Sequence, residues 1–162
     1  MAAAGGLDAM TNKRYATLAE LQALVGHDLG VSDWLQITQQ RIDQFAEATG
    51  DHQWIHVDPA RAASGPYGTT VAHGFLTLSM IPVLSDTAFA VDDVRMGINY
   101  GLNRVRFPGP VRVNSRIRAL FKLLAYEAID GGAQLVTEAS IEVEGSSKPV
   151  CVAESVSRRY VG

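Results

Sequence analysis

The segment Thr49–His56, TGDHQWIH, gathers side chains that can carry out acid/base chemistry. Asp51 and His56 can each accept and donate a proton, and irregular backbone after a helix end can turn both side chains into one pocket. Burial and mutual proximity would then move their pKa values toward neutrality. In the alternative, structural interpretation, Asp51 bonds loop amides and His56 is a satisfied core histidine. The local sequence alone leaves both interpretations open.

A metal-binding interpretation starts from His52 and His56, which have the i, i+4 spacing of the histidines on a zinc-protease helix. Gln53 stands where that motif has a glutamate, and Gly50 and Pro59 leave little room for the helix that would align both imidazoles. We therefore expect no metal at this segment.

Composition narrows the possible classes of function. The chain has 162 residues, 47% apolar content and a formal charge of −3, which is typical of one globular domain and gives no reason to expect a nucleic-acid partner. The longest apolar stretch, Gly74–Leu84, is too short to span a bilayer, so no membrane partner is expected. Residues 95–122 hold seven of the fourteen Lys and Arg and no acidic residue. This run is either a solvated strand face or a site for a small polyanion.

The single cysteine and the N-terminus favour a cytoplasmic protein. Cys151 has no partner for an intrachain disulfide, and we expect a packing thiol because it lies in a strand pattern without a nearby histidine. The N-terminus lacks the positive start and apolar run of a signal peptide. Residues 1–14 are interpreted as a disordered extension or an expression remnant, and residues 15–162 as a single domain.

Helices dominate the first half of the prediction. Residues 17–26 and 38–50 each begin with threonine and end with glycine, which predicts two amphipathic helices. A first strand is predicted at residues 33–37, and a short helix follows Asp58-Pro59. Residues 69–85 are apolar almost all round, as expected of a helix surrounded by other structure.

Alternating apolar and polar residues predict antiparallel strands in the second half. The clearest alternation is in residues 116–124 and 135–144, which flank the turn Asp130-Gly131-Gly132. Residues 95–107 and 149–161 complete the predicted sheet. One apolar helix and one sheet with a single apolar face must cover each other, so the expected class is α+β.

Three stretches together resemble the MaoC-like (R)-specific enoyl-CoA hydratases. They are FAEATGDHQWIHVDPARAA (45–63), AHGFLTLSM (72–80) and NRVRFPGPVRVNSRIRA (103–119). The resemblance implies a single hot-dog domain, in which an antiparallel sheet wraps around one long central apolar helix. It also implies a homodimer that needs no cofactor and adds water to trans-2-enoyl-CoA, giving (3R)-3-hydroxyacyl-CoA in fatty acid metabolism.

The resemblance also implies roles for individual residues. Asp51 and His56 would be catalytic, and His73 and Gly74 would bind the thioester at the start of the central helix. Acyl-pocket candidates are Trp54, Phe75, Leu76 and Met80, although core packing explains the helix residues equally well. Candidates for contact with the CoA phosphates are Arg95, Arg104 and Arg106.

Gln53-Trp54 departs from the family pattern, which usually has Asn-Pro at this point of the loop. Trp54 is then an aromatic pocket wall or a packing anchor. Alternative functions are a 3-hydroxyacyl-carrier-protein dehydratase, a non-catalytic acyl-CoA binding hot-dog protein and a hot-dog thioesterase. The intact spacing from Asp51 to His56 disfavours the non-catalytic protein, but it does not distinguish CoA from a carrier protein.

Overall fold

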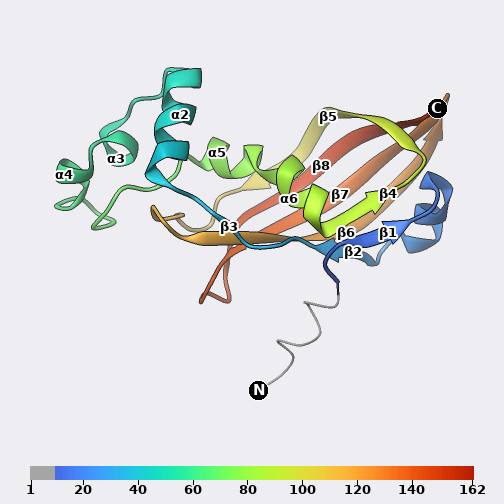
Figure 1. The fold of residues 1–162 in the computed structure, drawn as a ribbon, viewed down its shortest axis with the longest axis horizontal. Helices are drawn as coiled ribbons and strands as arrows, with labels where there is room; N and C mark the ends of the chain where they lie inside the picture. The colour runs from blue at the N-terminus through green and yellow to red at the C-terminus, as the bar shows by residue number, and fades with distance from the viewer. Residues whose placement is uncertain (1–9) are drawn as a thin grey trace.

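A six-stranded sheet and two consecutive helices form the body of the protein (Figure 1), whose structure is a computed structural model describing residues 10–162. The strand order is β2-β6-β7-β8-β5, with short β3 also paired to β6. The bounds are β2 (Asp28–Val31), β3 (Leu35–Gln36), β5 (Val94–Arg106), β6 (Arg116–Ile129), β7 (Gly132–Val143) and β8 (Pro149–Val161). All pairings in this sheet are antiparallel.

The predicted alternation places one face of the sheet in the core. On β6 the fully or almost fully buried residues are Ile117, Ala119, Phe121 and Leu123, and on β7 they are Ala133, Leu135, Ala139 and Ile141. Residues two apart on a strand point to the same face, so these rows cover one side of the sheet. The β6–β7 hairpin turns at Asp130-Gly131, where Gly131 has a φ of 76°.

The central helix is divided into two segments, which corrects the prediction of one long helix. α5 (Gly74–Ser79) and α6 (Ile81–Ala88) are separated at Met80 and lie over the sheet (Figure 1). Pro82 has no N–H to continue the hydrogen-bond ladder from α5, which accounts for a break at this point. No helix within residues 10–162 is long and apolar enough to cross a bilayer.

Three further helices gather at the end of the molecule from which α5 begins (Figure 1): α2 (Gln39–Thr49), α3 (Trp54–Val57) and α4 (Pro59–Ala62). The predicted caps are present. The Thr38 hydroxyl accepts a hydrogen bond from the Arg41 N–H, and the Asp58 carboxylate accepts one from the Arg61 N–H.

The N-terminal part of the fold differs from the prediction. The strand predicted at residues 33–37 is reduced to β3, and β2 was not predicted. Residues 18–24 form a 3-10 helix, η1 (Leu18–Leu24), without a hydrogen bond to the Thr17 side chain. β1 (Lys13–Tyr15) pairs with β4 (Phe89–Val91), so the fold includes residues ahead of the expected boundary at residue 15. The remainder of the predicted extension, residues 1–9, lies outside the described residues.

Gly30 allows β2 to pack against the end of α6. A Cβ at this position would overlap the main-chain oxygen of Ala88 and lie 3.1 Å from that of Met10. We predict that Gly30→Ala lowers the free energy of unfolding by ~1–3 kcal/mol, because overpacking forces the backbone to move. Gly101→Ala is the matched control, since a Cβ there meets nothing within 4 Å. Urea denaturation of both variants measures the difference, and equal stability would show that β2 and α6 can separate without cost.

Candidate active site

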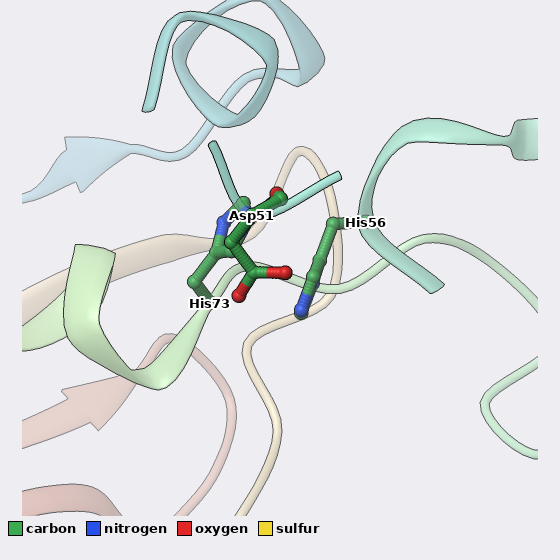
Figure 2. Close-up of side chains that lie close together, drawn as sticks. All are labelled: Asp51, His56 and His73. Carbon is green, nitrogen blue, oxygen red and sulfur yellow. The ribbon is translucent and has the colours of Figure 1, made fainter. Parts of the chain in front are cut away.

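Asp51, His56 and His73 converge from three different segments (Figure 2). Gly50 ends α2 with a φ of 81°, a left-handed conformation that directs the chain away from the helix axis and begins the loop at Asp51. His56 lies on the one-turn helix α3, and His73 immediately precedes α5. The potential ligand atoms of the three side chains all lie within 4.8 Å of one another.

The two histidines are buried and the carboxylate is accessible. His56 and His73 are 7% and 3% exposed, whereas Asp51 is exposed. The imidazole rings stack, with centroids 3.8 Å apart and an interplanar angle of 24°. A carboxylate open to solvent beside a sheltered imidazole is suited to exchange protons with a small molecule that enters from outside.

The hydrogen bond of His56 defines its tautomer. Nδ1 lies 2.6 Å from the main-chain oxygen of Val71, which can only accept, so Nδ1 carries the hydrogen and Nε2 keeps a free lone pair. Burial lowers the pKa of His56 below its ordinary value, and the neighbouring His73 also lowers it. The Val71 hydrogen bond and the Asp51 charge act in the opposite direction and raise this pKa, but the lowering is larger. The net lowering favours a neutral imidazole with Nε2 available as a base.

His73 holds the loop that carries Asp51. Its Nε2 lies 2.9 Å from the main-chain oxygen of Asp51 and therefore donates to it. Phe45 of α2 contacts the ring of His73, with centroids 4.9 Å apart. The Nδ1 atom of His73 is buried and has no hydrogen-bond partner among the described residues. These contacts are those of a residue that positions the Asp51 loop and the His56 ring.

A pocket of about 340 Å³ opens beside the cluster. His56 and Gly74 both line it, together with Tyr67 and Phe107. Gly74 is the first residue of α5, where a backbone N–H has no partner within the helix. A Cβ on Gly74 would lie 3.1–3.2 Å from the Phe107 ring, so glycine at this position lets the ring pack closely against the start of α5. The pocket thus brings the His56 ring and the first residue of α5 together.

The predicted acyl-pocket residues have different surroundings. Trp54 packs against Gly65 and beneath the guanidinium of Arg61, at 4.4 Å, which agrees with the packing-anchor interpretation. Leu76 is 2% exposed and belongs to the core. Phe75 is 69% exposed and contacts Phe107 edge-on.

Met80 lies between α5 and α6, and its sulfur contacts Arg41. A second pocket along these helices is lined by Leu78, Ser79, Ile81 and Pro82.

The three predicted phosphate contacts do not share one place on the chain. Arg106 ends β5 immediately before the pocket residue Phe107, and Arg104 lies two positions earlier. Arg95 is near the other end of the same strand, roughly 36 Å away at the ordinary rise of a β-strand. Within one chain, only Arg104 and Arg106 lie at the pocket end of β5.

The cluster has donor atoms that a metal ion could use: a carboxylate oxygen of Asp51, Nε2 of His56 and Nδ1 of His73. The two imidazole planes are stacked and nearly parallel, and a metal ion lies in the plane of each imidazole that binds it, so the arrangement suits proton transfer better than coordination. His52, the other histidine of the HQWIH segment, is separate and lies 3.6 Å from Glu47 at the surface. Cys151 is fully buried, and burial raises the pKa of its thiol to about 11, as expected of a packing residue.

The sequence analysis did not predict the residues that contribute a main-chain atom to the site or that reach it from a distant part of the sequence. Val71 supplies the oxygen that fixes the His56 tautomer, and Tyr67 and Phe107 form pocket walls. No chemical motif marks a main-chain oxygen in the sequence. The aromatic residue before Pro108-Gly109-Pro110 was the one available signal for Phe107.

Comparison with known proteins places this arrangement in a family. The model of the MaoC-like domain matches residues 20–145. The chain is 52% identical over 147 residues to 3-hydroxyacyl-thioester dehydratase Z of Mycobacterium tuberculosis, covering 90% of this chain and 97% of that protein. It is 42% identical over 145 residues to nodulation protein N of Rhizobium leguminosarum bv. viciae, covering 87% and 89%.

Solved structures agree at the level of the fold. The R-hydratase PhaJ1 from Pseudomonas aeruginosa superposes with a TM-score of 0.72 at 21% identity, covering 94% of this chain and 89% of that chain. The (R)-hydratase from A. caviae gives a TM-score of 0.67 at 22% identity, covering 82% and 94%. These likenesses establish the hot-dog architecture, and the family model together with the 52% identical relative establishes the membership. This chain belongs to the MaoC-like dehydratase family.

Proposed function

We propose that the protein is an (R)-specific enoyl-CoA hydratase that interconverts trans-2-enoyl-CoA and (3R)-3-hydroxyacyl-CoA. Membership in the MaoC-like family supports a hydro-lyase. The observation that carries the proposal is the convergence of Asp51 and neutral His56 beside a pocket that also contains the Gly74 N–H. Hydration needs a base for the water, a proton donor for C2 and a clamp for the thioester oxygen, and these groups supply all three.

Asp51 and His56 act together on one water molecule. Because the His56 tautomer leaves Nε2 as an acceptor and the Asp51 carboxylate also accepts, a water between them can donate one hydrogen to each. One proton passes to the pair as the water oxygen bonds to C3. The pair then returns one proton to C2, so the enzyme ends the cycle unchanged. The shared proton belongs to the pair rather than to either residue.

The thioester oxygen gains negative charge when the nucleophile adds to C3. A backbone donor aimed at that oxygen stabilises the enolate-like state without reorganising during the reaction. The Gly74 N–H is the donor proposed here, because it begins α5 and lines the same pocket as His56. Phe107 lines the same pocket and packs closely against Gly74.

The direct assay measures the loss of ultraviolet absorbance of the conjugated enoyl thioester when crotonyl-CoA is the substrate. Chiral separation of the product then identifies its configuration at C3. The proposal expects the (3R) product and no release of free CoA. Free CoA would indicate a thioesterase, and turnover of only carrier-bound substrates would indicate a carrier-protein dehydratase. Binding without turnover would identify a non-catalytic acyl-CoA protein.

Asp51→Asn and His56→Ala are each predicted to lower kcat by at least ~10²-fold, the usual scale for a positioned acid or base. His52→Ala is the matched control, because this histidine is exposed and interacts with Glu47 at the surface. Steady-state kinetics with crotonyl-CoA in the presence of a chelator measures the effect. Full activity in either folded site variant would remove the pair from the mechanism, and loss of activity on chelation would require a metal.

Gly74→Pro is predicted to lower kcat by ~10²- to 10³-fold, the loss expected when one oxyanion donor is removed. The fold should accept proline, because His73 already has φ −58° and ψ 139°, an extended conformation that a residue before proline prefers. Gly74→Ala keeps the N–H but brings a methyl group to 3.1 Å from Phe107, so its main effect should be on KM. Circular dichroism checks the fold. A folded proline variant with parental kcat would place the clamp elsewhere.

Arg106→Ala is predicted to raise KM for crotonyl-CoA by about 2- to 5-fold, consistent with loss of an exposed charge contact to the CoA phosphates. The same KM should rise with salt, because the Debye length falls from ~10 Å at 0.1 M to ~3 Å at 1 M. Arg14→Ala is the control, since Arg14 pairs with Asp92 beside β1, away from the pocket. A KM that responds to neither salt nor Arg106→Ala would exclude this phosphate site.

A homodimer through β5 is part of the proposal. β5 is the edge strand of the sheet, 13 residues long and exposed over most of its length. Its exposed apolar side chains are Met96, Ile98, Tyr100 and Leu102, and Phe75 and Phe107 extend the apolar surface. A long exposed apolar edge invites pairing with another strand, and a second copy of β5 can add to it antiparallel.

Tyr100→Asp is therefore predicted to convert the dimer into a monomer at micromolar concentration, because it places a charge in the middle of the apolar edge. Analytical ultracentrifugation measures the mass of the parent and the variant. Arg14→Ala, on β1 of the separate two-stranded sheet, should remain dimeric. A monomeric parent protein would contradict the proposed assembly.

A further inference from the structure

A polar chamber, partly open to solvent, lies between α6 and the sheet, beyond the active-site pocket. Its volume is about 170 Å³. Asp86 and Asn99 are exposed, whereas Ser157 is buried. The polar side chains of the lining are Ser85, Asp86, Asn99, Thr137, Ser155, Ser157 and Arg159, and apolar side chains such as Phe89 and Phe121 line the remainder.

Arg159 is the unusual member of the chamber. Its Nε is buried and has no hydrogen-bond partner among the described residues. Burial lowers the pKa of the guanidinium below its ordinary value, and the charge of Asp86 opposes this, yet arginine stays protonated. Gly97 faces Arg159 across the β5–β8 pair, where a Cβ would lie 3.3 Å from the guanidinium. The fold thus makes room for the buried N–H of Arg159 Nε, but no described residue provides a hydrogen-bond acceptor for it.

The active-site pocket, a second pocket and this chamber follow one another along α5 and α6, and this row of hollows is called the groove; the active-site pocket shares no lining residue with the second pocket. At the catalytic end Gly74 lies opposite Phe107, and one helical turn further a second pocket is lined by Leu78 and Ser79 together with Leu102. That pocket shares Ile81, Pro82, Asn99 and Ser155 with the polar chamber. Residue numbers rise along α5 and α6 while they fall along β5, as expected of a groove between the helices and an antiparallel strand.

The chamber lies at a distance that an acyl chain can reach. Its helix residues run from Ile81 to Asp86, which corresponds to roughly 10–18 Å from Gly74 at the rise of an α-helix. A thioester held at Gly74 would therefore place the end of a medium-length acyl chain among Ser155, Ser157 and Arg159. A four-carbon chain would end well before them.

We propose that the groove and chamber receive the distal end of the acyl chain and favour chains that carry a hydroxyl group there over plain alkyl chains. This inference rests on the proposed enoyl-CoA hydratase function. A distal hydroxyl oxygen accepts a hydrogen bond from Arg159 Nε, and its hydrogen can be donated to Asp86 or a serine oxygen. An alkyl end leaves the buried donor unsatisfied, and a carboxylate end meets the opposing charge of Asp86.

The decisive measurement compares kcat/KM for trans-2-decenoyl-CoA with that for its ω-hydroxy and ω-carboxy analogues, with octenoyl and dodecenoyl pairs to find the matching length. We expect the ω-hydroxy substrate to exceed the plain substrate by at least about 10-fold, which is modest for a site that hydrogen-bonds a substrate hydroxyl. A higher value for the ω-carboxy substrate would show that Arg159 acts as an anion site and would overturn the hydroxyl assignment. Equal values for all three would show that water fills the chamber and would overturn the inference.

Arg159→Met should abolish the ω-hydroxy preference while leaving crotonyl-CoA turnover unchanged. Arg158→Met is the matched control, because Arg158 is the adjacent residue on β8 and interacts elsewhere, with Gln134 and the Tyr100 ring. This control should retain the preference. A preference that persists in Arg159→Met would exclude the guanidinium as its cause. If that variant does not fold, Ser155→Leu provides the second test, since a larger side chain there should exclude decenoyl chains and spare crotonyl-CoA.

Failure of the proposed function can be distinguished from failure of this inference. Crotonyl-CoA turnover by the parent protein tests the function and does not involve the chamber. Calorimetric binding of saturated decanoyl-CoA and its ω-hydroxy analogue tests the chamber without requiring turnover. Tighter binding of the ω-hydroxy compound, lost in Arg159→Met, would support the chamber even in an inactive protein, and equal binding would overturn it.

Discussion

The hydrogen bond from His73 to the main-chain oxygen of Asp51 is the contact on which the site depends. It joins the loop after α2 to the start of α5 across 22 positions of sequence. The same imidazole ring stacks on His56 and packs against Phe45. One buried ring therefore fixes the loop of the carboxylate, the plane of the neighbouring imidazole and the beginning of the central helix.

The sheet provides the frame that keeps this contact in place. Its inner rows on β6 and β7 are apolar and bury the inner side of α6, so the helix cannot slide without exposing core residues such as Leu84. The α5 segment is then held at Met80, where Leu84 N–H donates to the Met80 oxygen. Because α5 ends where α6 begins, the position of Gly74 follows from the packing of α6. Core packing of α6 thus helps to position the first residue of α5 at the active-site end.

Sequence patterns predicted the elements that have local signals. The Thr38 cap and the Gly50 terminus define α2 correctly, and alternation defines β6 to β8, because capping and periodicity are properties of neighbouring residues. β2 was missed because DLGV is short and contains glycine, and only pairing with β6 makes it a strand. The apolar stretch was predicted as one helix although Pro82 interrupts it, and the structure divides the helix at Met80, ahead of that proline.

The site shows the same division between local and distant information. Asp51, His56, His73 and Gly74 could be named from the sequence because the resemblance preserves their spacing. The tautomer of His56 could not, since it depends on a main-chain oxygen of a residue 15 positions away. The separation of Arg95 from Arg106 could not be inferred either, because charge counting treats a basic run as one patch and ignores the length of the strand that carries it.

β8 shows why the polar chamber could not be predicted from the sequence. Its segment ESVSRR has polar residues on both faces, so alternation alone does not say which face is inside. The register with β7 settles this: Ala153 lies opposite Ala139, and Ser155, Ser157 and Arg159 follow in the same inner row. The inner row of β8 therefore changes from apolar to polar with distance from the active-site end. A break in the apolar pattern of a sheet face is expected where a side chain has a role other than stability, and the proposed acyl-chain site would give Arg159 such a role.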